Sequence, residues 1–193
     1  RCNYAGKPVV TATQMLESMT GAPRPTRAEA TDVANAILDG TDAVMLSGET
    51  AAGNYALDAV TCMASICREA EAYVDNVASY FQILEHQPIP MSISESMASS
   101  AVRTAQKVEA ALIITLSRTG TTARLISKYR PSAPILSVCY AEEKDPASTA
   151  RRSLISRGII PIIQPPEWAQ GNAVVPQQVM RNAILYARDT LGL

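Results

Sequence analysis

The sequence predicts an α/β protein built on parallel strands, and three observations lead to this class. Short apolar strands alternate with helix-length amphipathic segments along the whole chain. Three of the strands, 111–116, 134–139 and 159–163, are almost entirely apolar, which is typical of parallel strands buried on both faces. Hydrophobic residues make up 47% of the chain and charged residues 18%, enough for a sizeable aliphatic core.

The first half of the chain contains two strand–helix units. Its predicted elements, in order, are a strand at 9–13, a helix opened at Thr26, a strand at 43–46 and a helix over 57–74. Thr26 and Glu29 form a capping-box pattern at the start of the first helix, and Asp39-Gly40 ends that helix. This order predicts parallel strands joined by a right-handed crossover.

A segment with two prolines, 86–90, breaks this pattern. We therefore expect a domain boundary there, with a first domain at 1–86 and a second at 87–193. The predicted elements of the second domain are a helix opened at Ser92, strands at 111–116, 134–139 and 159–163, helices at 121–129 and 146–155, and a last helix over 179–191. Helices between parallel strands predict a three-layer domain with a mainly parallel sheet.

The helix opened at Ser92 carries the most detailed packing prediction of the second domain. Ser92 and Glu95 form a second capping-box pattern. Apolar residues then recur at helical spacing, so we expect one face of the helix to pack on the sheet. The residues of this face are Met97, Ala101, Val102, Ala105 and Val108.

Charge and cysteine content exclude several classes of protein. The net charge is −1, but residues 87–193 carry 12 Lys or Arg against 7 Asp or Glu. These charges are spread out and no helix-turn-helix pattern accompanies them, which argues against a nucleic-acid partner.

No apolar run approaches the roughly 18 residues that span a membrane. The cysteines are Cys2, Cys62, Cys67 and Cys139. None is in a CxxC pair, so we expect reduced thiols and neither a disulfide nor a metal site.

Polar side chains follow both strands of the first domain where each strand ends. Thr13 closes the first strand, and Ser47 and Glu49 follow the second. The carboxyl ends of parallel strands share one edge, where β/α-barrel enzymes bind their substrates. A strand-end hydroxyl is, however, more often a cap or turn residue. Two units also fit either part of a barrel or an open sheet, so the residues alone leave both alternatives open.

The loop 117–122 joins a buried strand to a helix. It combines hydroxyl groups, a glycine turn and one positive charge, supplied by Ser117, Arg118, Thr119, Gly120, Thr121 and Thr122. Backbone amides that turn inward at a helix N-terminus favour an anion such as phosphate. The alternative is an ordinary glycine turn without a ligand.

Several blocks of the chain resemble the pyruvate kinase family in one register. They are Lys7-Pro8-Val9, Ala12 to Met19, Pro23 to Glu29, Asp32 to Ala36 and Met45 to Ala51, with Lys128-Tyr129-Arg130-Pro131 further on. The resemblance implies that the first domain is the last two units of a TIM-type (β/α)8 barrel. It implies that the second domain is the family's α/β C-terminal domain, which we expect to be truncated.

The resemblance also implies roles for the strand-end residues. In the family, the threonine that matches Thr13 contacts phosphoenolpyruvate, and Ser47 and Glu49 match residues that line the same pocket as hydrogen-bond partners of the groups that touch the substrate. These three are the expected catalytic residues, Thr13 also binding substrate. Thr13 or Ser47 would relay a proton to the enolate carbon together with bound water, because a hydroxyl alone is too weak an acid.

Two further sites follow from the resemblance. Arg27 and Glu29 are expected at a subunit interface, the equal alternative being a helix cap with a local ion pair. The loop Ser117 to Thr122 matches a loop that binds a sugar bisphosphate effector in several members of the family. Thr121 stands where a second basic residue is common, so the identity of the effector stays open.

The implied activity is the glycolytic transfer of phosphate from phosphoenolpyruvate to ADP, giving pyruvate and ATP. It implies Mg²⁺ or Mn²⁺ and K⁺ as cofactors and a homotetramer in the cytoplasm, a plastid being the other compartment. The family's metal, potassium and lysine groups match no position here, so we expect the chain alone to be inactive. The alternative function is a non-catalytic regulatory module that binds a phosphorylated metabolite.

Overall fold

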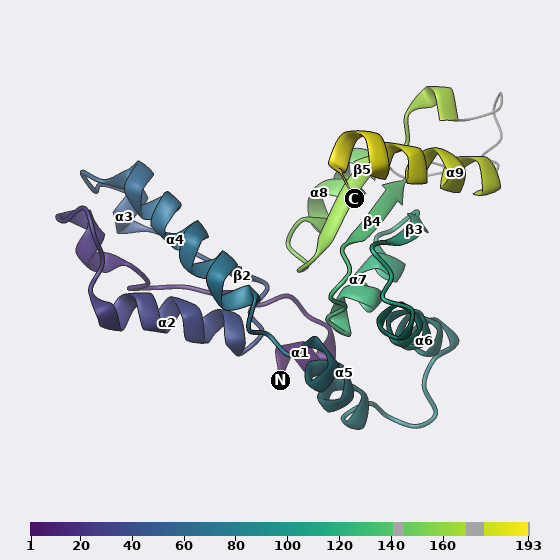
Figure 1. Cartoon of the computed structure of the whole chain (residues 1–193), viewed down its shortest axis with the longest axis horizontal. Helices are drawn as coiled ribbons and strands as arrows, with labels where there is room; N and C mark the ends of the chain where they lie inside the picture. Colours follow the sequence, from purple (N-terminus) through teal and green to yellow (C-terminus); the bar gives the residue numbers. More distant parts are fainter. Residues whose placement is uncertain (141–144, 169–175, 193) are drawn as a thin grey trace. The chain divides into compact units, whose positions relative to one another are not determined.

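The chain forms two compact units, each described here by itself (Figure 1). The structure is a computed structural model, and it describes residues 1–193 except 141–144, 169–175 and 193. One unit consists of residues 7–75 together with Cys2. The other consists of residues 76–193 together with Arg1 and residues 3–6. We call them the 7–75 unit and the 76–193 unit.

The 7–75 unit has two short parallel strands and helices that follow them. Its elements are β1 (Val10–Thr11), the 3₁₀ turn η1 (Glu17–Thr20), α2 (Arg27–Leu38), β2 (Ala43–Val44), α3 (Gly48–Ala51) and α4 (Ala56–Glu71). Val10 pairs with Ala43 and Thr11 pairs with Val44. The strands are shorter than predicted because, within the described chain, neither has a second neighbour to hold its ends.

The core of this unit is aliphatic. Leu16 and Met19 lie in the segment after β1, and both are 0% exposed. They pack in one cluster with Val33 of α2 and with Ala59 and Met63 of α4. The chain that leaves β1 is therefore anchored in the core within a few residues of the strand end.

Gly53 lies between α3 and α4 at a position with no room for a side chain. A methyl group added there would lie 2.4 Å from the Glu49 carbonyl oxygen and 3.1 Å from Thr20 Cα. We expect Gly53→Ala to lower the free energy of unfolding by about 1–3 kcal/mol, because the backbone must move. Urea unfolding measures the loss. Gly21→Ala is the matched control, since nothing lies within 4 Å of its added methyl. Equal stability of the two variants would contradict the crowding at Gly53.

The 76–193 unit is an α/β domain around a three-stranded parallel sheet. Its elements are α5 (Asn76–Glu85), α6 (Ile93–Lys107), β3 (Ile113–Ser117), α7 (Thr121–Lys128), β4 (Ile135–Cys139), α8 (Pro146–Ser153), β5 (Ile159–Ile163), η2 (Pro166–Trp168), α9 (Pro176–Tyr186) and the π-helical turn Ala187–Leu191; the short helix α1 (Cys2–Ala5) begins the chain. The strand order is β3-β4-β5, and the central strand β4 is buried along its whole length. The predicted α/β class with parallel sheets is confirmed.

Helices cover both faces of this sheet (Figure 1). On one face, Val102 of α6 and Ile126 of α7 pack with Ile135. On the other face, Val179 of α9 packs with Leu136. Ile135 and Leu136 are neighbours in β4, and their side chains point to opposite faces as strand geometry requires. The arrangement has the three layers that the apolar strands predict.

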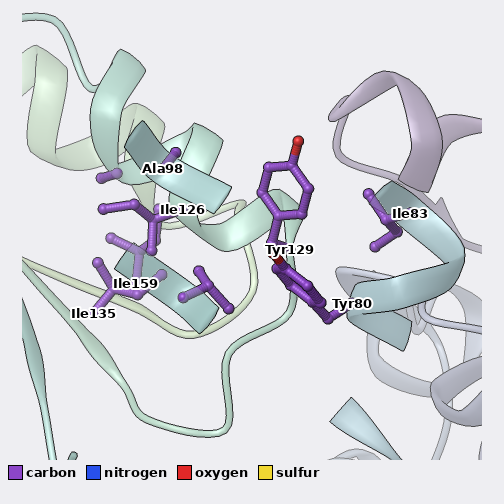
Figure 2. Packing of buried hydrophobic residues seen from close by; sticks show 9 residues of the cluster. Tyr80, Ile83, Ala98, Ile126, Tyr129, Ile135 and Ile159 are labelled. Atoms are coloured by element: carbon purple, nitrogen blue, oxygen red, sulfur yellow. The ribbon is translucent and has the colours of Figure 1, made fainter. Parts of the chain in front are cut away.

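Helix α5 packs into the first of these clusters. Tyr80 and Ile83 are 4% and 3% exposed, and Figure 2 shows them beside Tyr129. Tyr80 Oη lies 2.9 Å from Ser99 Oγ of α6. The compact units therefore divide between residues 75 and 76, because the apolar face of α5 finds its partners in later residues. The division into domains at 1–86 and 87–193 stays a prediction.

Helix α6 buries part of the predicted face, including Val102 and Ala105, but not all of it. Ala98, Val102 and Ala105 are buried, whereas Met97 is 67% exposed and Val108 is 66% exposed. The prediction for Met97 and Val108 was wrong. The buried face of the helix includes Ala98, the smaller residue next to Met97, so the Met97 side chain points to solvent. No helix in the described part of the chain is long and apolar enough to cross a bilayer.

Residues 3–6 pack within the 76–193 unit. The Gly6 carbonyl accepts a hydrogen bond from Arg124 Nη1 at 2.8 Å, and Asn3 Oδ1 accepts one from Arg130 Nη2 at 3.2 Å. Tyr4 stacks on His86 with ring centroids 4.0 Å apart. The segment that precedes β1 is thus held by α7 and by the residues after α5.

Candidate functional site

The strand ends of the 7–75 unit carry Thr13 and Ser47 at the surface. Both residues are exposed, and their strands are parallel neighbours, so the two carboxyl ends lie at the same edge. Thr13 Oγ1 donates a hydrogen bond to the Ala12 carbonyl at 2.6 Å. The Ser47 hydroxyl makes no hydrogen bond to the described residues. This edge therefore presents two hydroxyl groups that a ligand can reach.

Thr13 and Gln14 have a strained backbone. Their φ angles are 71° and 54°, in the left-handed region that non-glycine residues rarely adopt, a β-branched threonine least of all. Such strain costs about 1–3 kcal/mol per residue and persists only where the surroundings hold it. The next two residues, Met15 and Leu16, are 4% and 0% exposed and anchor the turn in the core.

Glu49 lies behind this edge, not on it. Its side chain is 1% exposed. Oε1 accepts a hydrogen bond from Leu16 N at 3.0 Å and Oε2 accepts one from Ser47 N at 2.8 Å. Burial raises the pKa of Glu49, but the backbone amides of Glu49, Ser47 and Leu16 together outweigh it and hold the pKa below its usual range. The carboxylate thus joins the loop after β1 to the loop after β2.

Glu29 and Thr26 form the predicted capping box at the start of α2, which is the capping part of the local alternative for Glu29. Glu29 also accepts hydrogen bonds from Ser18 N at 2.7 Å and from Ser18 Oγ. No ion pair joins Glu29 to Arg27 among the described residues. Burial raises the pKa of Glu29, but four hydrogen bonds from Ser18 and Thr26 outweigh it and lower the pKa to about 2.

The low pKa of Glu29 predicts a pH-dependent contribution to stability. Because the folded-state pKa of about 2 lies below the ordinary glutamate value of 4.5, the contribution is complete above about pH 4.5 and is lost as pH falls toward 2. We expect Glu29→Gln to lower the free energy of unfolding by about 1 kcal/mol at pH 6 and by much less at pH 2.5. The value at pH 6 is small because solvent screens the charge of a partly exposed carboxylate. Urea midpoints at the two pH values measure this. A difference between wild type and variant that does not shrink on acidification would contradict it.

Arg27 lines an apolar groove between α2 and α4. The groove has a volume of about 540 Å³, and most of its wall comes from Ala30, Ala34, Leu38, Ile66, Ala70 and Tyr73. Leu38 is 49% exposed and Tyr73 is 80% exposed. Contiguous apolar surface of this kind is typical of a face that meets another protein surface. The interface role of Arg27 and Glu29 stays a prediction.

The loop 117–122 forms a glycine turn at the carboxyl end of β3. Ser117 is buried, and its Oγ accepts a hydrogen bond from Gly120 N at 2.9 Å. Gly120 has a φ of 82° and precedes α7, whose start has no side-chain cap among the described residues. Arg118, Thr119, Thr121 and Thr122 are exposed. Ser117 therefore builds the turn, while the other side chains and the helix start face solvent.

A buried polar cluster at the end of α7 was missed by the sequence analysis. Lys128 Nζ donates hydrogen bonds to Glu95 Oε1 at 2.7 Å and to Gln87 Oε1 at 2.6 Å, and Tyr129 Oη donates to Glu95 Oε1 at 2.7 Å. Ser92 Oγ accepts from Glu95 N as predicted, but the Glu95 carboxylate turns to Lys128, so the second capping box is only half formed.

The described residues do not assemble a metal site. No group of three or more His, Cys, Asp or Glu side chains lies close enough together in that part of the chain to hold a metal ion. Glu49 and Glu29, two carboxylates that bind the chain after β1, have their oxygens bound by backbone amides and hydroxyl groups. These hydrogen bonds occupy the oxygens that a magnesium ion would need.

Comparison with known proteins places both units in one family. The family profile described as "Pyruvate kinase, barrel domain" matches residues 1–60, and "Pyruvate kinase, alpha/beta domain" matches residues 95–189. Cytosolic isozymes of pyruvate kinase from Nicotiana tabacum and Glycine max are 53% and 58% identical, and they align with 100% and 84% of this chain. A crystal structure of Cryptosporidium parvum pyruvate kinase superposes with a TM-score of 0.88 at 47% identity over the whole chain. The chain spans 39%, 34% and 37% of the length of these three relatives.

Proposed function

Because the chain belongs to the pyruvate kinase family, we propose that a protein containing it with the remaining barrel units transfers the phosphoryl group of phosphoenolpyruvate to ADP. The products are pyruvate and ATP. The observation that carries the proposal is the pair of exposed hydroxyl groups, on Thr13 and Ser47, at one edge of parallel strands. Both residues lie within the segment that matches the family's barrel domain.

Thr13 and Ser47 have the chemistry that the second half of this reaction needs. Loss of the phosphoryl group leaves an enolate, which must gain a proton at its methylene carbon to become pyruvate. A hydroxyl group that hydrogen-bonds to bound water passes a proton without itself being a strong acid. Thr13 and Ser47 are the candidates for this relay. The Glu49 carboxylate accepts a hydrogen bond from the backbone amide of Ser47, which favours a positioning role for this residue.

The metal-dependent half of the reaction lies outside this chain. Phosphoryl transfer needs divalent metal and positive charge around the moving group. Mg²⁺ or Mn²⁺ and K⁺ would supply these in the intact protein, held by residues of the other barrel units. We propose on this ground that the 193-residue chain by itself has no activity.

The second domain and the compartment complete the proposal. The exposed loop residues Arg118, Thr119, Thr121 and Thr122 favour a phosphorylated effector at the start of α7. The apolar groove beside Arg27 favours assembly of subunits into a homotetramer. The cytosolic relatives from tobacco and soybean favour the cytoplasm.

A coupled assay that follows pyruvate formation tests the proposal. The intact protein should turn over phosphoenolpyruvate and ADP, Thr13→Val should lower kcat about a hundredfold, and the 193-residue chain should be inactive. Absence of turnover by the intact protein, with saturable binding of a sugar phosphate, would favour the alternative regulatory module.

A further inference from the structure

The backbone that follows the Thr13–Gln14 turn is held by two carboxylates from two different elements. Glu49 at the start of α3 accepts a hydrogen bond from Leu16 N at 3.0 Å. Glu29 in the first turn of α2 accepts one from Ser18 N at 2.7 Å. Two amides, two residues apart, are therefore fixed a few residues after the strained pair of left-handed residues.

Glu29 makes more hydrogen bonds than a helix cap requires. The capping box needs only its bonds with Thr26, which are present. The bonds to Ser18 N and Ser18 Oγ are additional, and they join α2 to η1, a segment that follows β1. The next residue in η1, Met19, is 0% exposed, so this segment is also anchored by packing.

We infer that Glu29 is a positioning residue for the Thr13 hydroxyl, acting through Ser18 and the backbone between them. The inference rests on the proposed function, in which Thr13 meets the substrate. A left-handed turn of two non-glycine residues relaxes unless both sides are held. On one side Thr11 is paired with Val44 in the strand pair. On the other side, hydrogen bonds from the backbone amides of Leu16 and Ser18 to Glu49 and Glu29 fix the chain.

The test compares Glu29→Gln with Thr26→Ala in the intact protein. Glutamine keeps the shape of Glu29, but its amide nitrogen cannot accept the hydrogen bonds from Ser18 Oγ and Thr26. Alanine at position 26 removes the cap and leaves the Ser18 bonds in place. We expect Glu29→Gln to lower kcat about tenfold with an almost unchanged KM for phosphoenolpyruvate, because a small displacement of a reacting group affects the chemical step. Thr26→Ala should lower the unfolding midpoint by a similar amount and leave kcat within about twofold.

Ser18→Ala is the milder second variant, which removes one of the two bonds from Ser18. It should also lower kcat. If Ser18 and Glu29 act through the same hydrogen bonds, the loss of kcat in the double variant should be smaller than the product of the losses in the two single variants. Full additivity of Ser18→Ala with Glu29→Gln would overturn the inference. Equal kcat losses in Thr26→Ala and Glu29→Gln would also overturn it, because Glu29 would then act only as a cap.

Amide hydrogen exchange of the intact protein provides a readout that does not depend on activity. In Glu29→Ala, which removes both acceptor oxygens, exchange at the Ser18 amide should become about tenfold faster, whereas Thr26→Ala should leave it within about twofold of wild type. Unaltered exchange at Ser18 in Glu29→Ala would show that the carboxylate does not hold this loop. If the wild-type protein has no turnover, the proposed function fails, and the exchange result still decides whether Glu29 holds the turn.

Discussion

Replacing Lys128 with methionine is expected to lower the free energy of unfolding by about 3–5 kcal/mol. The side chains of Lys128 and Glu95 are 6% and 16% exposed, and their charged atoms lie 2.7 Å apart. Methionine keeps the aliphatic length of lysine but removes the charge. The Glu95 carboxylate then stays in a largely buried place without its bonded cation. Urea unfolding at pH 7 measures the loss.

The double variant Lys128→Met with Glu95→Gln separates charge from packing. We expect it to recover most of the lost stability, because no unpaired charge remains in the cluster. Lys107→Met, at the exposed end of α6, is the control and should change stability by less than about 0.5 kcal/mol. If the double variant is as unstable as Lys128→Met alone, the loss comes from the lysine stem that packs against Gly6, and the ion pair is not its cause.

Glu49→Gln is expected to lower the free energy of unfolding by about 2–3 kcal/mol. The carboxylate accepts hydrogen bonds from two backbone amides at a site that is 1% exposed. Glutamine offers one acceptor oxygen, and its amide nitrogen faces the other backbone donor. One of the two backbone N–H groups, of Leu16 or Ser47, thus loses its acceptor and is placed against the N–H₂ group of the glutamine. Urea unfolding of the variant at neutral pH measures the effect.

Glu17→Gln provides the matched control for Glu49→Gln, because it makes the same chemical change at an exposed position in the same unit. Its stability should stay within about 0.5 kcal/mol of wild type. The depressed pKa of Glu49 adds a second expectation: the difference between wild type and Glu49→Gln should shrink as pH falls below the ordinary range of a glutamate. A difference that is the same at pH 7 and pH 3 would show that the charge of Glu49 makes no contribution.

Local patterns predicted the elements of this fold well. The apolar runs at 134–139 and 159–163 contain β4 and β5, since a strand that is continuously apolar needs cover on both faces. The Thr26 and Glu29 pattern became a complete capping box. The strand exits at Thr13 and Ser47 were found because the end of a parallel strand fixes which edge of the sheet its next residues occupy.

Contacts between distant residues could not be predicted in this way. Glu95 shows the reason most directly. A capping-box pattern relates Glu95 to Ser92, three positions away, whereas the Glu95 side chain pairs with Lys128, 33 positions away. The same separation divides Glu49 from Leu16. Sequence neighbours were enough to expect Glu49 near the substrate pocket, and the packed structure adds that its oxygens accept hydrogen bonds from two backbone amides.

The contacts of residues 3–6 have a consequence for the order in which the chain folds during synthesis. Their hydrogen-bond partners in the 76–193 unit, Arg124 and Arg130, lie 118 and 127 positions later. At a translation rate of about 5–20 residues per second, residues 3–6 wait on the order of ten seconds for these partners to be made. The packing partners of the 7–75 unit core lie within that unit and are made sooner. Residues 3–6 are therefore synthesised well before the residues that they contact in the folded protein.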